Sequence, residues 1–236
     1  MDSILRRRFT VLLGLIEAGA VLVIAFAGCS GASTPPTTTT TPSSTGEITT
    51  SPPSATNVQG DFVSLLADGH TRLAPSTDGL QVIAYACDGD DANAPTFAPW
   101  FIGSVSDNSV ELVSTTDGYK LQATLTPQNT SGTITLKEGT TLAFTAEHLT
   151  TADNEVGSGL YRGQATFNGE RYLAGWIVDK PEPNDIPRQG RAIVNQQTRE
   201  FMNAPQLEEE DISAKHVPVP YLVTFPLAKC HLGTCS

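Results

Sequence analysis

The stretch YKLQATLT at residues 119–126 decides the fold class, because its apolar and polar side chains alternate with a period of two. Tyr119, Leu121, Ala123 and Leu125 form one face, and Lys, Gln or Thr residues stand between them. One apolar and one polar face per strand is typical of an antiparallel sheet that water reaches on one side. The same period recurs at residues 133–137, 141–147 and 172–178.

Turn signals separate these alternating runs. Asp117-Gly118, Glu138-Gly139 and Asn168-Gly169 each stand between two of them, and glycine supplies the positive φ that tight hairpin turns need. We expect roughly ten strands in an all-β, antiparallel meander that forms a barrel or a sandwich. Besides the alternating runs, the expected strands are 61–66, 80–87, 100–105, 109–115, 191–195, 200–203 and 217–225. The only helix we expect is a short one at 206–215.

The first 28 residues differ from the rest and predict a signal peptide or a membrane anchor. Arg6, Arg7 and Arg8 precede an apolar segment at 9–28, which is interrupted by Glu17. A positive n-region before an apolar run keeps the N-terminus in the cytoplasm and sends the following chain across the membrane. If the segment is not cleaved, it is just long enough for a single span of about 30 Å.

Ala27-Gly28-Cys29 closes this segment and resembles the lipobox of bacterial lipoproteins. The resemblance implies that Cys29 carries a lipid and becomes the mature N-terminus. Phe26 stands where that family usually has Leu, Val or Ile three residues before the cysteine. Lipidation would anchor the protein on the outer side of the cell membrane, since each buried methylene contributes about 0.8 kcal/mol.

Residues 29–56 predict a disordered tether, because 20 of the 24 residues at 33–56 are Ser, Thr or Pro. A signal, a cysteine and a Thr/Pro stalk together resemble cell-envelope lipoproteins of actinobacteria, including mycobacteria. The run VIAYACDG at 82–89, Trp100, Gly103 and GLYR at 159–162 are similar to a small exported β domain of such bacteria. The resemblance implies a location and a fold, without a settled activity.

Residues 57–229 are expected to form the extracytoplasmic all-β domain, and 230–236 a cysteine-containing tail. From Cys29 onward, 11 basic residues face 23 acidic residues, a net charge of −12. Nucleic acid is therefore excluded as a partner, because phosphates require clustered Lys and Arg. The membrane is the expected partner, with an envelope protein, a polysaccharide or a lipid as ligand, and we find no cofactor motif.

Three cysteines, Cys87, Cys230 and Cys235, follow Cys29, and an exported protein can keep disulfides. The short loop between Cys230 and Cys235 favours that pair, with Cys87 bonded to one of them as the alternative. Cys230, His231 and Cys235 also offer three metal donors. We expect no metal there, because the spacing matches no familiar zinc pattern.

Other polar clusters carry weak chemical signals. Asp88, Asp90, Asp91 and Asn93 form an acidic turn rich in the oxygen ligands that calcium prefers, but Pro99 stands where a calcium loop needs a glutamate. None of the four histidines, His70, His148, His216 and His231, has neighbours in sequence that suggest a catalytic triad. The acidic run at 208–211 is typical of a solvated face.

Large aromatic residues are the remaining candidates for ligand binding. Trp100, Tyr161, Tyr172 and Trp176 could stack on a sugar or a lipid if they line one mouth of a barrel, although aromatics in a small β domain usually belong to the core. The sequence thus favours a tethered binding module without enzymatic activity. The alternatives are an exported hydrolase whose site assembles only in space and a structural component of the envelope.

Overall fold

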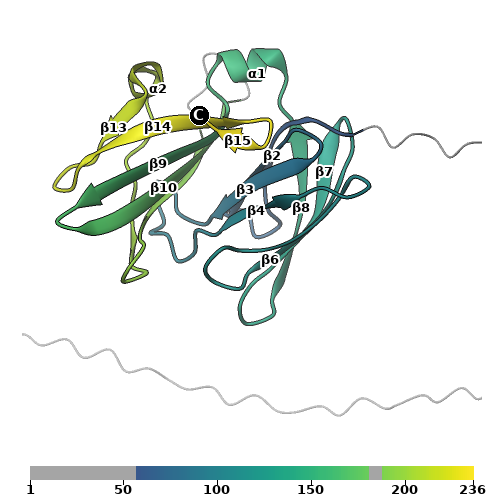
Figure 1. The fold of residues 1–236 in the computed structure, drawn as a ribbon, viewed down its shortest axis with the longest axis horizontal. Coiled ribbons are helices and arrows are strands. Elements are labelled where there is room, and N and C mark those ends of the chain that lie inside the picture. Colours follow the sequence, from purple (N-terminus) through teal and green to yellow (C-terminus); the bar gives the residue numbers. More distant parts are fainter. Residues whose placement is uncertain (1–56, 181–187) are drawn as a thin grey trace, which may run out of the picture. The chain divides into compact units, whose positions relative to one another are not determined.

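The structure is a computed structural model that describes residues 57–180 and 188–236, which form an almost entirely β body. The strands of the first sheet are β1 (Gly60–Leu65), β2 (Arg72–Thr77), β3 (Gln81–Cys87), β4 (Trp100–Ser104), β5 (Ser109–Val113), β6 (Lys120–Leu125), β7 (Asn129–Thr135) and β8 (Thr141–His148). The strands of the second sheet are β9 (Gly159–Phe167), β10 (Glu170–Asp179), β11 (Arg188–Asn195), β12 (Phe201–Met202), β13 (His216–Pro218), β14 (Thr224–His231) and β15 (Thr234–Cys235). Two short helices are α1 (Thr151–Glu155) and α2 (Glu209–Ala214). The predicted all-β antiparallel architecture is confirmed (Figure 1).

The first sheet is a nearly closed barrel with the strand order β4-β3-β2-β1-β8-β7-β6-β5. Its two end strands meet at a seam, where the amide of Thr115 donates to the carbonyl of Trp100 at 3.1 Å and Ser106 pairs with Ser109. The second sheet has the order β12-β11-β10-β9-β14-β13, and β15 pairs with β14. Every strand pair in both sheets is antiparallel, so turns and short loops make most connections.

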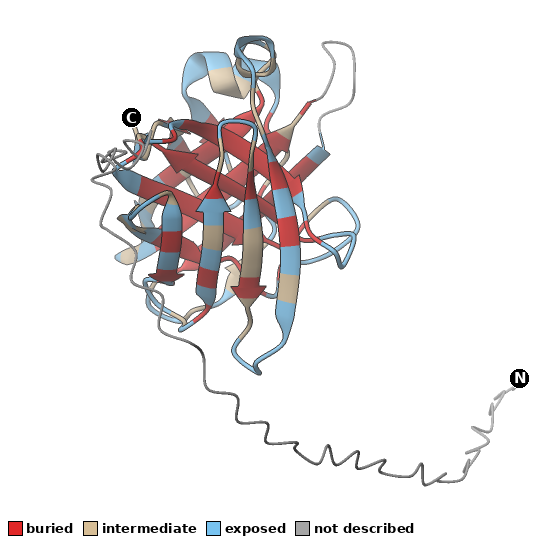
Figure 2. Ribbon diagram, turned by 90° about the vertical axis from the view of Figure 1, so that its right-hand side faces the viewer, coloured by how far each residue is buried: buried red, intermediate tan, exposed pale blue. Residues whose placement is uncertain are grey.

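The hydrophobic core has three parts, which follow from the two sheets. The first lies inside the barrel and includes Phe62, Leu121 and Ile134. The second part lies between the outer face of β1–β4 and the second sheet. The third part lies on the opposite face of the second sheet, where residues 204–227 cover Trp176. Strands β2 and β3 are therefore buried on both faces, whereas β5 alternates between exposed and buried residues. The strands that face the viewer in Figure 2 show this alternation.

Tyr85 on β3 packs directly against the backbone of β10 in the second sheet. A Cβ atom on Gly175 would lie 2.5 Å from the ring of Tyr85, so only glycine fits beneath that ring. Tyr85 also packs on Trp100, with ring centroids 4.5 Å apart, and the guanidinium of Arg162 lies 5.4 Å from the Trp100 ring. Burial lowers the pKa of Arg162, and the cation–π contact partly replaces its lost hydration.

Several expected boundaries need correction. The tail at 230–236 belongs to the domain, because β14 continues to His231 and β15 pairs with it. The expected strand at 217–225 is a hairpin of β13 and β14, since Pro218 and Pro220 lack the N–H that a continuous strand donates. Helix α1 was missed, although Thr150 and Asp153 form a capping box there. Strand β2 was missed because a proline within a run argues against a strand, although β2 passes through Pro75 without a break.

Two buried tyrosines offer a matched test of this packing. The hydroxyl of Tyr85 lies near the Cys87 thiol and the Ala192 backbone without a hydrogen bond of normal geometry, whereas that of Tyr161 donates to the carbonyl of Gly157 at 2.8 Å. We expect Tyr85→Phe to leave the free energy of unfolding unchanged or to raise it, because it removes an unpaired polar group. Tyr161→Phe should lower it by about 1 kcal/mol, because a made hydrogen bond is lost.

Urea denaturation of both variants measures these changes. A Tyr85→Phe protein destabilised as much as the Tyr161→Phe protein would show that the Tyr85 hydroxyl has a partner after all.

Candidate functional site

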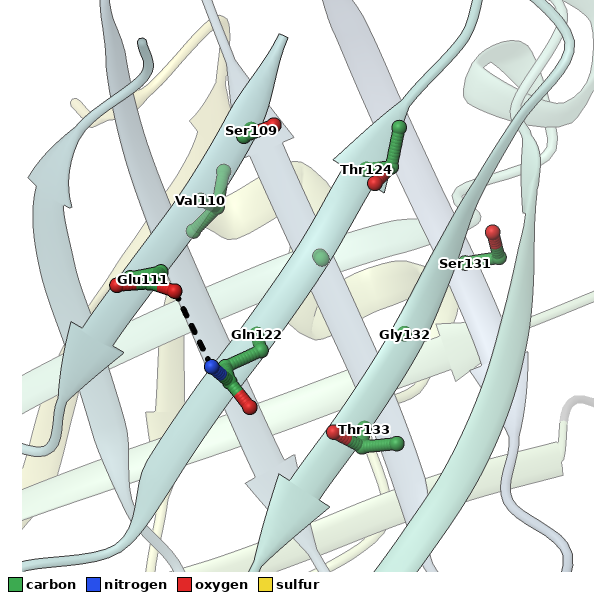
Figure 3. A pocket seen from close by; sticks show the side chains of 9 residues that line it. Ser109, Val110, Glu111, Gln122, Thr124, Ser131, Gly132 and Thr133 are labelled. Atoms are coloured by element: carbon green, nitrogen blue, oxygen red, sulfur yellow. Dashed lines mark hydrogen bonds between the residues drawn. The ribbon is translucent and has the colours of Figure 1, made fainter. Parts of the chain in front are cut away.

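The outer face of β5, β6 and β7 belongs to the part of the barrel that the second sheet leaves open, and it carries a shallow hollow (Figure 3). Because side chains alternate along a strand, the residues between the core positions point outward here. The outward-facing residues that line the hollow are Ser109, Glu111, Gln122, Thr124, Ser131 and Thr133. The hollow has a volume of about 360 Å³.

The strand register arranges these six side chains in two rows. Ser109, Thr124 and Ser131 are neighbours across the three strands, and so are Glu111, Gln122 and Thr133. Neighbouring strands lie about 4.8 Å apart, and positions two residues apart on a strand lie about 6.7 Å apart. The result is a regular grid of hydrogen-bonding groups on a rigid sheet.

Two small residues line the hollow at positions that face the inside of the barrel. Ala123 and Gly132 face each other across β6 and β7. A Cβ atom on Gly132 would come within 1.9 Å of the carbonyl oxygen of Gln122, so the two backbones approach too closely for any side chain. Any residue larger than glycine at this position would have to push the strands apart.

The hollow is nearly neutral. Its one charged residue is Glu111, and the side-chain amide of Gln122 donates to it at 3.2 Å. The remaining groups are hydroxyls, which both donate and accept hydrogen bonds. This lining suits a neutral ligand rich in hydroxyl or amide groups, and it offers neither a cation for a phosphate nor an activated nucleophile for a reaction.

The four aromatic candidates do not form a common surface. Trp100, Tyr161, Tyr172 and Trp176 are all buried, with exposed fractions between 0% and 8%. Trp100 belongs to the cluster between the sheets, and the other three belong to the cluster on the far face of the second sheet. The expectation of an aromatic mouth is therefore corrected, because the four rings are buried in two clusters on opposite faces of the second sheet.

The disulfide prediction is confirmed for Cys230 and Cys235, which face each other on β14 and β15. The alternative pair with Cys87 is thereby excluded, and Cys87 is a buried free thiol. Within residues 57–180 and 188–236, no three His, Cys, Asp or Glu side chains gather as a metal site would require. Cys29, the predicted lipidation site, lies outside the described residues.

The acidic turn uses its carboxylates internally. Asp88 accepts hydrogen bonds from the amides of Thr96 and Phe97, and Asp90 accepts from the amides of Ala92 and Asn93. Desolvation raises the pKa of Asp90, but these hydrogen bonds outweigh it and leave the pKa below its ordinary value. Asp91 pairs with Arg191 at 2.5 Å. The three carboxylates point to separate partners and do not converge on a calcium position.

One of the four histidines meets a buried carboxylate. Nδ1 of His231 lies 2.5 Å from Oδ2 of Asp61, and the hydroxyl of Ser76 donates to Oδ1 of the same carboxylate at 2.6 Å. Sequence reasoning missed Asp61 and Ser76, because 170 positions separate Asp61 from His231. No local signal could have found this contact.

The other three histidines have no such partner in the part of the chain that the structure describes. His70 lies beside exposed Asp68, His148 packs on Phe62, and His216 contacts the carbonyl of Ala214. Neither described helix is long or apolar enough to cross a membrane. Comparisons of the chain with protein-family models, with curated proteins and with solved structures find no match.

The environment of Cys87 predicts that its thiol is unreactive in the folded protein. Burial raises the pKa of Cys87 to about 12, so almost no thiolate is present at pH 8. We expect iodoacetamide to label Cys87 at least about 100-fold more slowly in the native protein than in guanidinium chloride. Peptide mass mapping measures the label at Cys87 itself, and rapid native labelling would mean that β3 opens readily.

Proposed function

We propose that the protein is an exported lipoprotein of the bacterial envelope that acts as a tethered binding module. The observation that carries the proposal is Cys29, which follows a basic and apolar leader and precedes a Ser/Thr/Pro segment of 24 residues. A lipid at Cys29 would hold the chain at the outer side of the membrane, and the tether would let the β domain search the space above it.

The disulfide between Cys230 and Cys235 supports an extracytoplasmic location. Disulfides persist in oxidising compartments and are rare in the cytosol of mesophiles, where thiol systems keep cysteines reduced. The acidic balance of the chain supports the same proposal, because it disfavours binding to nucleic acid. The disulfide bears on the place where the protein acts, and the charge bears on its partners.

The hollow on β5–β7 is the face that supports binding best. It is a rigid, open surface whose hydroxyl and amide groups repeat in two rows. A polysaccharide presents hydroxyl groups at regular intervals, so it can satisfy several of these groups at once. Among an envelope protein, a lipid and a polysaccharide, the nearly neutral hydrogen-bonding lining favours the polysaccharide.

The location is tested by expressing the full-length chain in an actinobacterium. We expect membrane fractions to hold a product that begins at Cys29 and carries the additional mass of acyl chains, because the lipobox directs both steps. Intact-mass spectrometry of the detergent extract measures both features. A Cys29→Ala variant is the control and should lack the acyl mass, and a wild-type chain found intact in the cytosol would contradict the proposal.

The binding face is tested with a triple variant, Thr124→Val/Ser131→Ala/Thr133→Val, which removes three hydroxyls and keeps the strands. We expect retention on an insoluble cell-wall polysaccharide fraction to fall about tenfold or more, since each lost hydrogen bond costs about 0.5–1.5 kcal/mol. Thr141→Val is a matched control, because Thr141 is an exposed residue on β8 outside the hollow. Equal retention of the triple variant and the wild type would rule out this face.

A second candidate function, an exported hydrolase, is favoured by one contact. Asp61 orients His231 as the carboxylate of a catalytic dyad orients its general base. Ser76 donates to Asp61 and not to the histidine ring, so the contact lacks an activated hydroxyl. Hydrolysis of an ester, amide or glycoside substrate that is lost in His231→Ala would favour the hydrolase. If neither binding nor hydrolysis is found, we expect a structural component of the envelope.

A further inference from the structure

The C-terminal hairpin has little of its own to hold it together. Its strands β14 and β15 pair through only two residue pairs, Cys230 with Cys235 and His231 with Thr234. One further backbone bond runs from the amide of Ser236 to the carbonyl of Lys229 at 3.3 Å. Two-residue pairing is marginal in water, so the disulfide at the base of the hairpin is its main constraint.

The tip of this hairpin, residues 231–234, reaches from the second sheet to the first. His231 contacts the carboxylate of Asp61 on β1. The amide of Leu232 donates to Oδ1 of Asp61 at 3.3 Å, and the amide of Gly233 donates to the hydroxyl of Ser76 on β2 at 3.1 Å. Three consecutive residues of the tip therefore share one small polar site on the barrel.

The fit of the tip is close. Gly233 has a φ of +78°, which favours glycine, and a Cβ atom there would lie 2.8 Å from the carbonyl oxygen of Gln81. The tip thus rests directly on the backbone of the turn between β2 and β3. Such contact requires the hairpin to keep one defined conformation, which the six-residue disulfide ring imposes.

Asp61 depends on the tip. The residue is 4% exposed, and its Oδ2 contacts His231 while Oδ1 accepts from Ser76 and Leu232. A buried carboxylate must be paired or hydrogen-bonded, because an unpaired buried charge costs several kcal/mol. If the tip leaves, water must reach Asp61 in its place, so the docked and undocked states are two distinct arrangements.

We propose that the Cys230–Cys235 disulfide is a redox-controlled latch, whose reduction by a dithiol releases the hairpin tip and opens the Asp61–Ser76 site to water. Cys230 is buried and Cys235 is partly exposed, so Sγ of Cys235 is the sulfur that an incoming thiolate reaches. Attack there breaks the S–S bond, and the bonding electron pair passes to Sγ of Cys230, which takes up a proton.

The second thiol of the reductant completes the exchange. It attacks the reductant's own sulfur in the mixed disulfide with Cys235. The thiolate of Cys235 leaves and takes up a proton, and the reductant becomes an intramolecular disulfide. Two electrons and two protons have moved from the dithiol to the protein. The ring around 230–235 is then open, and the chain entropy that it had removed from the hairpin returns.

The latch connects interior strands of the two sheets, so its release removes a contact between them. Strand β14 pairs with β9 in the centre of the second sheet, whereas Asp61 and Ser76 belong to the barrel. Reduction therefore removes a polar connection between the layers at the border of their apolar packing, because Cys230 belongs to the cluster between the sheets and Cys235 packs against it. The released state keeps both sheets and exposes a carboxylate next to a hydroxyl.

Hydrogen exchange of the full-length protein tests the latch. We expect reduced dithiothreitol to speed the exchange of the Leu232 and Gly233 amides about tenfold or more, because both lose their acceptors on the barrel. Amides of β7, on the far part of the barrel, should keep their rates. Alkylation and peptide mass mapping report in the same samples that Cys230 and Cys235 have become thiols.

Matched variants separate the latch from the other thiols. Cys87→Ala should keep the full response to dithiothreitol, and Cys230→Ala/Cys235→Ala should exchange rapidly with or without it. His231→Ala should loosen the tip while the disulfide stays intact, because it removes one docking contact from an exposed residue. Unchanged exchange at 232–233 in wild-type protein with both thiols formed would overturn the proposal, as would a disulfide that dithiothreitol reduces only when the whole domain unfolds.

Discussion

The structure depends on the burial of β2 and β3 on both faces. One face of these strands fills the barrel, and the other packs against the second sheet, where Tyr85 lies over Gly175. An antiparallel barrel of this size can leave its whole outer face to water, but the run VIAYAC at 82–87 cannot, because both of its faces are apolar. The second sheet covers that surface and removes its apolar side chains from water.

The packing of the second sheet on the barrel also decides which strands of the barrel are covered and which are exposed to water. Because the second sheet covers only β1–β4, the strands β5–β7 keep an open face of hydroxyl and amide groups. Two charged side chains that are withdrawn from water have ionic partners: Arg72 donates to Asp179 at 3.2 Å, and Lys180 donates to Glu209 at 2.7 Å. Desolvation lowers the pKa of Arg72, which shows how far this guanidinium is withdrawn from water.

A buried carboxylate gives the C-terminal hairpin its place. Asp61 accepts from the Ser76 hydroxyl on β2 and also contacts an imidazole and an amide of the hairpin that the disulfide closes. Polar networks of this kind are specific, because each member is left unsatisfied when another one moves. Reduction or formation of the Cys230–Cys235 disulfide is thereby connected to the contact of the hairpin tip with Asp61 and Ser76.

The sequence by itself determined the class of the fold and most of its strands, since alternation with a period of two is a local property of an extended backbone. It indicated β6, β7, β8 and β10, placed the short helix α2 and favoured the pair Cys230 and Cys235, because each of these features joins residues close in the chain. Only the tertiary structure decided which sheet covers which face, that Trp100 and Trp176 lie in different layers, and that Asp61 meets His231 across 170 residues. Such contacts depend on how the two sheets pack on each other, and the order of side chains within one strand does not determine that packing.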